Sequence, residues 1–245
     1  LIISYRSAKR HDDVQQSLDK LTADFSGHSG LPAALYDIAR IYERLREYTE
    51  AKKIYQQITA NHSRSPEAAK TQLSTPRITI LAHIDGKTDA SAAIEQFIAD
   101  FSSHPELPSS LYDIARRYER AKLYKNAENL YERIIQQYSG SPSAKQARLG
   151  VRRSQALSYI ESKNFEQAAS AINSMLVDFA GHPDLSEALY DVGIRYERAG
   201  QYQQAKDAYR QITQGYPTSS HGGRAGMDSS KVDIYLLIDS GQTAA

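Results

Sequence analysis

The chain has 245 residues, of which 40% are hydrophobic and 24% charged, and its formal net charge at pH 7 is +1. This near-neutral charge gives no electrostatic case for binding nucleic acid or an anionic membrane surface. The absence of cysteine excludes disulfides, thiolate zinc sites and cysteine nucleophiles, and no apolar run approaches the roughly 20 residues that span a bilayer.

The chain opens on a partial helical hairpin, predicted over residues 1–25. Its first helix is Ile2 to Arg10, in which Ile2-Ile3-Ser4-Tyr5 looks like the tail of a further unit. A second helix contains Val14 and ends near Asp24-Phe25. We therefore expect the sequence to begin inside a repeating unit and to be a fragment of a longer protein.

Residues 31–62 predict a complete hairpin of two helices. Apolar residues recur at positions i, i+3, i+4 and i+7, which is the spacing of one helical face. They are Leu35, Ile38, Ala39 and Tyr42 in the first helix and Tyr48, Ala51, Tyr55 and Ile58 in the second. Small alanines at the crossing point allow the two backbones to approach each other.

A second, weaker hairpin is predicted over residues 66–103. Ser65-Pro66 is typical of a helix N-cap followed by proline in the first turn. Pro76 lies inside the helix that would follow, and an interior proline breaks or kinks a helix. We therefore expect the first helix of this hairpin to start again near Thr75-Pro76.

This pair of hairpins then repeats. The phrase Leu-Tyr-Asp-Ile-Ala-Arg-x-Tyr-Glu-Arg starts at Leu35, again 76 residues later at Leu111 and, more loosely, 78 residues after that at Leu189. The further hairpins are predicted at 107–139, 142–180 and 185–216, with a partial one at 224–245. In the last, Lys231 to Ser240 reads as a first helix without a second. A fixed period of this kind is the signature of a stacked solenoid.

These hairpins resemble the tetratricopeptide repeat family, which uses about 34 residues for each helix–turn–helix unit. The residues on the family's spacing are Leu35, Ala39, Tyr42, Ala51 and Tyr55; Leu111, Ala115, Tyr118, Ala127 and Tyr131; and Leu189, Gly193, Tyr196, Ala205 and Tyr209. The resemblance implies an all-α fold, a right-handed α-solenoid that covers residues 1–245 as a single body. It also implies a non-catalytic protein–protein interaction scaffold that binds a peptide or protein domain along its concave face.

The resemblance also places candidate binding residues. The tyrosine after each repeated leucine and the residue four positions later face the concave groove, and they are Tyr36 with Arg40, Tyr112 with Arg116, and Tyr190 with Ile194. Tyrosine and arginine on one helical face could stack on and pair with an extended acidic or aromatic peptide. We expect Tyr36, Arg40, Tyr112 and Arg116 to be exposed on that side.

Two readings of these pairs stay open. In the alternative, the tyrosine packs on the neighbouring helix and the arginine pairs with Asp37 or Glu43 at helical spacing. Family members that grip a chaperone's C-terminal carboxylate carry lysine and asparagine at the two groove positions. The tyrosine and arginine of this chain do not support that ligand.

Further arginines complete the set of candidates. Arg44 and Arg120 end the first helices of their hairpins, where a cation interacts favourably with the helix dipole. Arg153 lies close to Arg148 and Arg152 in the sequence. These three form a basic patch that could meet an acidic partner or could be a solvated helix face.

No catalytic or metal-binding motif is present in the sequence. His28, His104 and His182 occupy equivalent loops of successive repeats, too far apart to share a metal, and no phosphate-binding glycine loop or nucleophile elbow is found. We therefore predict no enzyme activity, no cofactor and no metal, and a protein or peptide partner without nucleic acid or membrane insertion.

Two other functions remain as alternatives. The first is end-to-end self-association through apolar residues near the C-terminus, such as Ile234, Tyr235 and Leu237. The second is a role as the targeting arm of a larger multidomain enzyme. The Tyr-Pro-x-Ser ending at Tyr216 to Ser219 resembles a variant common in bacterial envelope proteins, and the compartment stays open.

Overall fold

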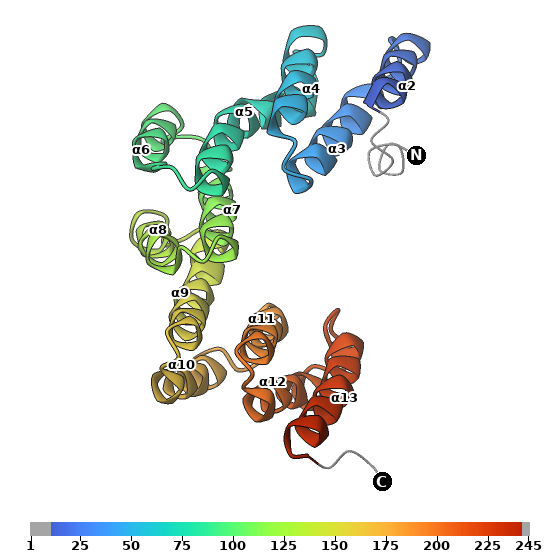
Figure 1. Ribbon diagram of the computed structural model, residues 1–245. Coiled ribbons are helices and arrows are strands. Elements are labelled where there is room, and N and C mark those ends of the chain that lie inside the picture. The colour runs from blue at the N-terminus through green and yellow to red at the C-terminus, as the bar shows by residue number, and fades with distance from the viewer. Residues whose placement is uncertain (1–10, 242–245) are drawn as a thin grey trace. The chain divides into compact units, whose positions relative to one another are not determined.

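The computed structural model describes residues 11–241, and all regular secondary structure in this range is α-helical (Figure 1). The expected helix over Ile2 to Arg10, with its Ile2-Ile3-Ser4-Tyr5 tail, lies outside the described residues. The chain divides into two compact units, Leu1–Ser102 and Ser103–Ala245. Within the described range no helix is long and apolar enough to span a bilayer.

Unit 1 contains five described helices, α2 to α6. They are α2 (His11–Asp24), α3 (Leu31–Arg44), α4 (Tyr48–Asn61), α5 (Pro66–Asp85) and α6 (Ser91–Asp100). Each of α3 and α5 packs against α4, and α3 also contacts α5. The apolar stripe predicted for this hairpin forms the core, since Leu35, Ala39, Ala51, Tyr55 and Ile58 are fully buried.

The described part of unit 2, residues 103–241, contains seven helices, α7 to α13. They are α7 (Leu107–Arg120), α8 (Tyr124–Gln137), α9 (Pro142–Glu161), α10 (Phe165–Asp178), α11 (Leu185–Arg198), α12 (Tyr202–Gly215) and α13 (Gly222–Asp239). Helix α9 contacts α7, α8, α10 and α11, so the first helix of one hairpin packs on the first helix of the next. The last helix begins nine residues before the expected start at Lys231.

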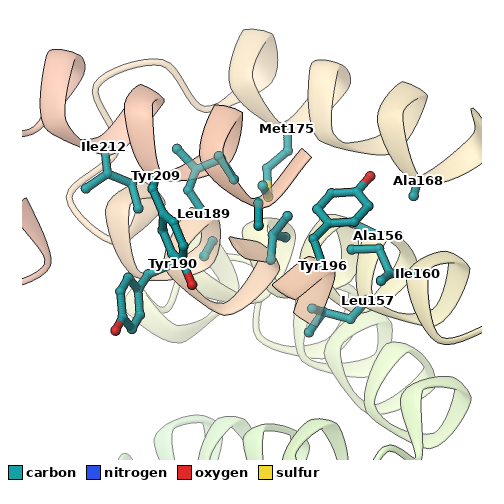
Figure 2. Packing of buried hydrophobic residues seen from close by; sticks show 14 of the residues in the cluster. Ala156, Leu157, Ile160, Ala168, Met175, Leu189, Tyr190, Tyr196, Tyr209 and Ile212 are labelled. Carbon is teal, nitrogen blue, oxygen red and sulfur yellow. The ribbon is translucent and has the colours of Figure 1, made fainter. Parts of the chain in front are cut away.

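The core of unit 2 joins successive hairpins. Figure 2 shows part of this cluster, and its labelled side chains come from α9, α10, α11 and α12. Leu157 of α9, Met175 of α10, Leu189 of α11 and Ile212 of α12 belong to this one cluster and are nearly or fully buried. Because each hairpin leaves an apolar face that its neighbour covers, the fold is an α-solenoid of stacked helix–turn–helix repeats.

The expected helix restart at Thr75-Pro76 is wrong. Helix α5 begins at Pro66, where Ser65 Oγ accepts a hydrogen bond from the N–H of Ala68 at 3.1 Å, and it continues through Pro76 to Asp85. Proline removes one backbone hydrogen bond there. Residues on both sides of it, among them Leu73 and Ile78, are buried in unit 1, and this packing offsets the loss.

The turns inside the hairpins share a positive backbone φ, although most of the residues there are not glycine. One residue in each turn has a positive φ, between 55° and 72°. In the described hairpins these residues are Arg46, Lys87, Lys122, Lys163 and Gly200. Glycine adopts this left-handed conformation at little cost, whereas other L-residues pay a steric penalty.

Candidate functional site

The best-connected polar group of unit 2 is the buried carboxylate of Glu119 in α7. Arg153 of α9 donates to both carboxylate oxygens, from Nε at 3.0 Å and from Nη2 at 2.9 Å. Arg116 and Ser154 donate at 2.7 Å each, and the hydroxyl of Tyr131 in α8 donates at 3.1 Å. One carboxylate therefore joins three helices, and we name this set of five residues the Glu119 cluster.

The charge of Glu119 is favoured despite its burial. Burial by itself would raise the pKa of this carboxyl group, but the guanidinium groups of Arg153 and Arg116 hold the pKa below its ordinary value. An anion that is paired and fully hydrogen-bonded avoids the large cost of an isolated buried charge. The cluster therefore belongs to the interior of the stack.

The placement of Arg153 in an exposed basic patch is wrong. Its side chain is 1% exposed and is committed to Glu119 and to the hydroxyl of Tyr131, which lies 3.2 Å from Nη2. The ring of Tyr131 also fills the space beside Gly150, where an added Cβ would lie 2.7 Å from it. Arg148 is exposed and Arg152 is half-buried, so the three arginines do not form one surface.

The expected exposure of Arg116 is also wrong. The residue is 9% exposed, and besides Glu119 it pairs with two acids of α11, Glu187 at 2.5 Å and Asp191 at 3.2 Å. These acids come from α11, two hairpins further along the chain, so a helical spacing rule within α7 alone could not reveal them. In unit 2 the arginine connects repeats and is not left for a partner.

The tyrosines of unit 2 pack against neighbouring helices, as the alternative interpretation of the sequence predicts. Tyr112 is half-buried against Tyr131, with ring centroids 5.5 Å apart, and burial raises its pKa. Tyr190 is 6% exposed and donates a hydrogen bond of 2.5 Å to Asp228. Burial, together with this hydrogen bond, raises the pKa of Tyr190 to about 12. The Tyr190 ring is therefore covered, whereas the Tyr112 ring stays partly exposed, as Tyr36 does in unit 1.

Unit 1 contains an equivalent buried ion pair. Arg77 of α5 donates to both oxygens of Glu43 in α3, at 2.7 and 3.0 Å. Arg40 pairs with the same glutamate at 3.2 Å, as the alternative reading predicted. The hydroxyl of the equivalent Tyr55 is buried and forms no hydrogen bond within the described residues.

A surface nevertheless remains open on unit 1. The side chain of Arg40 is 43% exposed. Tyr36 is half-buried and packs on Tyr55 with ring centroids 5.5 Å apart. The ammonium group of Lys70 from α5 lies 5.6 Å from the centroid of the Tyr36 ring. We name Tyr36, Arg40 and Lys70 the α3–α5 surface, and Lys70 is a member that the sequence did not single out.

The remaining candidates lie at helix ends or in loops. Arg44 and Arg120 are exposed in the last turns of α3 and α7. His28, His104 and His182 each accept a hydrogen bond at Nδ1 from the backbone N–H two residues later, at 3.0, 3.1 and 3.2 Å. These histidines therefore stabilise their loops. Over residues 11–241 no cluster of three potential ligands that could hold a metal is found.

Comparisons with known proteins agree with this repeat. The family model for the tetratricopeptide repeat matches residues 33–65 and 187–219, which cover the first and third copies of the long hairpin. No curated protein matches the chain significantly. Among solved structures, a tetratricopeptide repeat protein from Parabacteroides merdae ATCC 43184 aligns over 96% of this chain and 90% of its own, at 14% identity and a TM-score of 0.45.

The two matched segments are helical hairpins, α3 with α4 and α11 with α12, and each carries the leucine, small residue and tyrosine of the repeated phrase. Residues 33–65 and 187–219 of the chain are therefore tetratricopeptide repeats.

Proposed function

We propose that this chain is a non-catalytic protein–protein interaction module that binds an extended acidic segment of a partner through the α3–α5 surface. Proteins of this family generally mediate protein–protein interaction. The observation that carries the proposal is the exposed side of Arg40, next to a tyrosine ring that already has Lys70 over it. The expected partner is therefore a peptide that carries carboxylates and a side chain able to contact the Tyr36 ring.

The three side chains offer complementary interactions. Arginine forms charge-assisted, often bidentate hydrogen bonds with a carboxylate. The ammonium of Lys70 adds a second cation from the neighbouring repeat, and the half-buried Tyr36 ring provides a rigid, partly apolar contact at low entropic cost. Two helices of unit 1 contribute, so a ligand along this surface would contact both α3 and α5.

The difference between the units supports this choice. The equivalent arginine in unit 2, Arg116, already satisfies its charge with Glu119, Glu187 and Asp191. A partner carboxylate at that position would have to displace buried ion pairs, which is costly. Arg40 pairs with Glu43 at 3.2 Å and its side chain is 43% exposed, so a partner carboxylate could approach it at lower cost.

The test uses two labelled peptides of equal length, one alternating glutamate and tyrosine and the other alternating lysine and tyrosine. Fluorescence anisotropy with the whole chain should show binding of the first peptide alone. Arg40→Gln and Lys70→Gln should each weaken binding about tenfold, as the loss of a charge-assisted hydrogen bond predicts. Lys52→Gln, an exposed charge on α4, is the control and should leave affinity unchanged. Equal binding of both peptides would contradict the proposal.

A second candidate function is self-association through α13. Met227, Ile234, Leu237 and Ile238 are each at least half exposed on this helix. The equivalent positions of α9 include Leu149, Ala156 and Ile160, which are nearly or fully buried, so the same surface is covered where a further hairpin is present. Light scattering over a concentration series tests whether a second copy covers it, and Ile234→Glu should then lower the measured mass.

A further inference from the structure

Unit 1 contains a pocket at the end of its first complete hairpin. The loop between α2 and α3 and the loop between α4 and α5 line a solvent-open hollow of about 470 Å³, within the range of roughly 300–1,000 Å³ that is common for small-ligand sites. Gly27 and His28 line it from the first loop and His62 and Arg64 from the second. None of its lining residues is acidic. We name it the loop pocket.

In the equivalent junction of unit 2, a tyrosine connects the two loops. There the loop from α10 to α11 faces the loop from α12 to α13, and the hydroxyl of Tyr216 accepts a hydrogen bond from the N–H of Gly181 at 3.2 Å. Two repeat periods separate Gly181 from Gly27 and Tyr216 from His62. The loop pocket therefore occupies the place where the later copy inserts a phenol ring.

The first copy lacks that ring. Its loop keeps two of the backbone hydrogen bonds of the later copy, from the N–H of His28 to Phe25 and from the N–H of Leu31 to His28, but Gly27 does not share the positive φ of Gly181. Its His62 is shorter than tyrosine and makes no hydrogen bond to Gly27, although both residues line the pocket. The same loop also carries a cation, Arg64, where the later copies have Gly140 and Thr218. The loss of the tyrosine and the gain of the arginine are specific to this junction.

The side chains around the pocket are mostly polar and include one cation, Arg64. His28 accepts from the N–H of Gly30 at its Nδ1, at 3.0 Å, so a neutral ring carries its hydrogen on Nε2 and can donate from there. The pocket also reaches Pro32 and Pro66, in the first turns of α3 and α5. Helix N-termini favour anions, and a lining with no carboxylate adds no repulsion.

We propose that the loop pocket binds an aromatic ring with an anionic oxygen substituent, such as an aryl phosphate. The ring takes the place that Tyr216 fills in the later copy, and the oxygens face the N–H of Gly27 and the guanidinium of Arg64. The ligand is a phosphorylated tyrosine side chain of a protein or a free aryl phosphate, since both present the same group. This site shares no residue with the α3–α5 surface and does not depend on the function proposed above.

The test measures binding of phenyl phosphate to the whole chain by titration calorimetry, with phenol and inorganic phosphate as separate probes. Phenyl phosphate should bind at least about tenfold more tightly than either part alone, because ring and anion contribute separately. A short peptide that contains phosphotyrosine forms a further arm. Tighter binding of the peptide than of phenyl phosphate identifies a protein as the source, and equal binding identifies a free aryl phosphate.

Two substitutions make the first junction like the later copies and should therefore preserve the fold. His62→Tyr fills the pocket and should abolish binding of phenyl phosphate, while Arg64→Thr should weaken it about tenfold or more by removal of one charge-assisted hydrogen bond. Circular dichroism checks that both variants stay helical, and Lys52→Gln serves as the surface-charge control.

The proposal is overturned if phenyl phosphate does not bind, or if His62→Tyr binds it as well as the natural chain does. The proposed role of the aromatic ring is overturned if inorganic phosphate binds as tightly as phenyl phosphate, because the ring would then contribute nothing to affinity.

Discussion

Glu119 of α7 and Arg153 of α9 form a two-point ion pair, at 3.0 and 2.9 Å, between side chains that are 2% and 1% exposed. The same relationship recurs between Glu43 and Arg77 in unit 1, and Glu197 pairs with Lys231 at 2.9 Å near the end of unit 2. Each pair connects the first helices of two adjacent hairpins. These polar contacts specify which face of one repeat meets the next.

Arg153→Met should destabilise the chain by about 3–5 kcal/mol, because it leaves the buried carboxylate of Glu119 without its principal partner. The double variant Glu119→Met, Arg153→Met should recover at least about 1 kcal/mol relative to Arg153→Met, since no unpaired anion remains at that position. Urea unfolding followed by circular dichroism measures both values.

Arg148→Met is the matched control, since Arg148 is exposed on the same helix and should change stability by no more than about 0.5 kcal/mol. If Arg153→Met were equally mild, the ion pair would not hold α7 and α9 together.

Glu119 should also make stability dependent on pH in the acid range. Its pKa in the folded chain lies below the ordinary value of 4.5, so the unfolded chain takes up a proton first as the pH falls. The contribution of Glu119 is therefore fully present above pH 4.5 and declines below it, toward the lower pKa of the folded state.

A comparison of the natural chain with Glu119→Gln tests this dependence. The difference in unfolding free energy between the two should be largest at neutral pH and should shrink as the pH falls below the ordinary value of 4.5. A difference that stays the same over the acid range would mean that folding does not lower the pKa of Glu119.

The helical hairpins follow from the sequence because helix periodicity is a local property. Leucine, alanine and tyrosine at i, i+4 and i+7 lie on one face of a helix, whatever the tertiary structure around it. Leu35, Ala39 and Tyr42 are accordingly buried. The helix through Pro76 is a different case, since burial of Leu73 and Ile78 by neighbouring helices outweighs the local preference.

The polar interior was harder to predict. A glutamate or arginine on a helix is usually solvated, and only the neighbouring hairpin reveals whether a counter-charge is present. The sequence does contain a signal for these ion pairs. A basic residue, arginine or lysine, follows 34 positions after each of Glu43, Glu119 and Glu197. The sequence drew attention to the exposed Arg44 and Arg120 instead of these buried neighbours.

Lys163→Gly should stabilise the chain by about 0.5–1 kcal/mol. Lys163 has a φ of 59° in the turn between α9 and α10, and glycine relieves the strain of a left-handed conformation. At the equivalent position of a later hairpin the chain already uses Gly200, with a φ of 72°.

Lys52→Gly is the control for that substitution. Lys52 is exposed in the interior of α4, where glycine should destabilise by about 1 kcal/mol. The two lysine-to-glycine changes should therefore move the unfolding midpoint in opposite directions, and the same sign for both would contradict the role of the turn conformation.

His182 should stabilise the loop between α10 and α11 through its Nδ1, which accepts from the N–H of Asp184 at 3.2 Å. His182→Ala removes this acceptor and should cost about 0.5–1.5 kcal/mol, the usual value of one hydrogen bond. His182→Asn places an amide oxygen at a comparable distance from the backbone and should lose less than half as much. Part of any residual loss reflects the edge contact of His182 with Phe179, whose ring centroid is 6.0 Å away. Thermal unfolding of the three chains measures the order, and an Asn variant as unstable as the Ala variant would assign the whole effect to the aromatic contact.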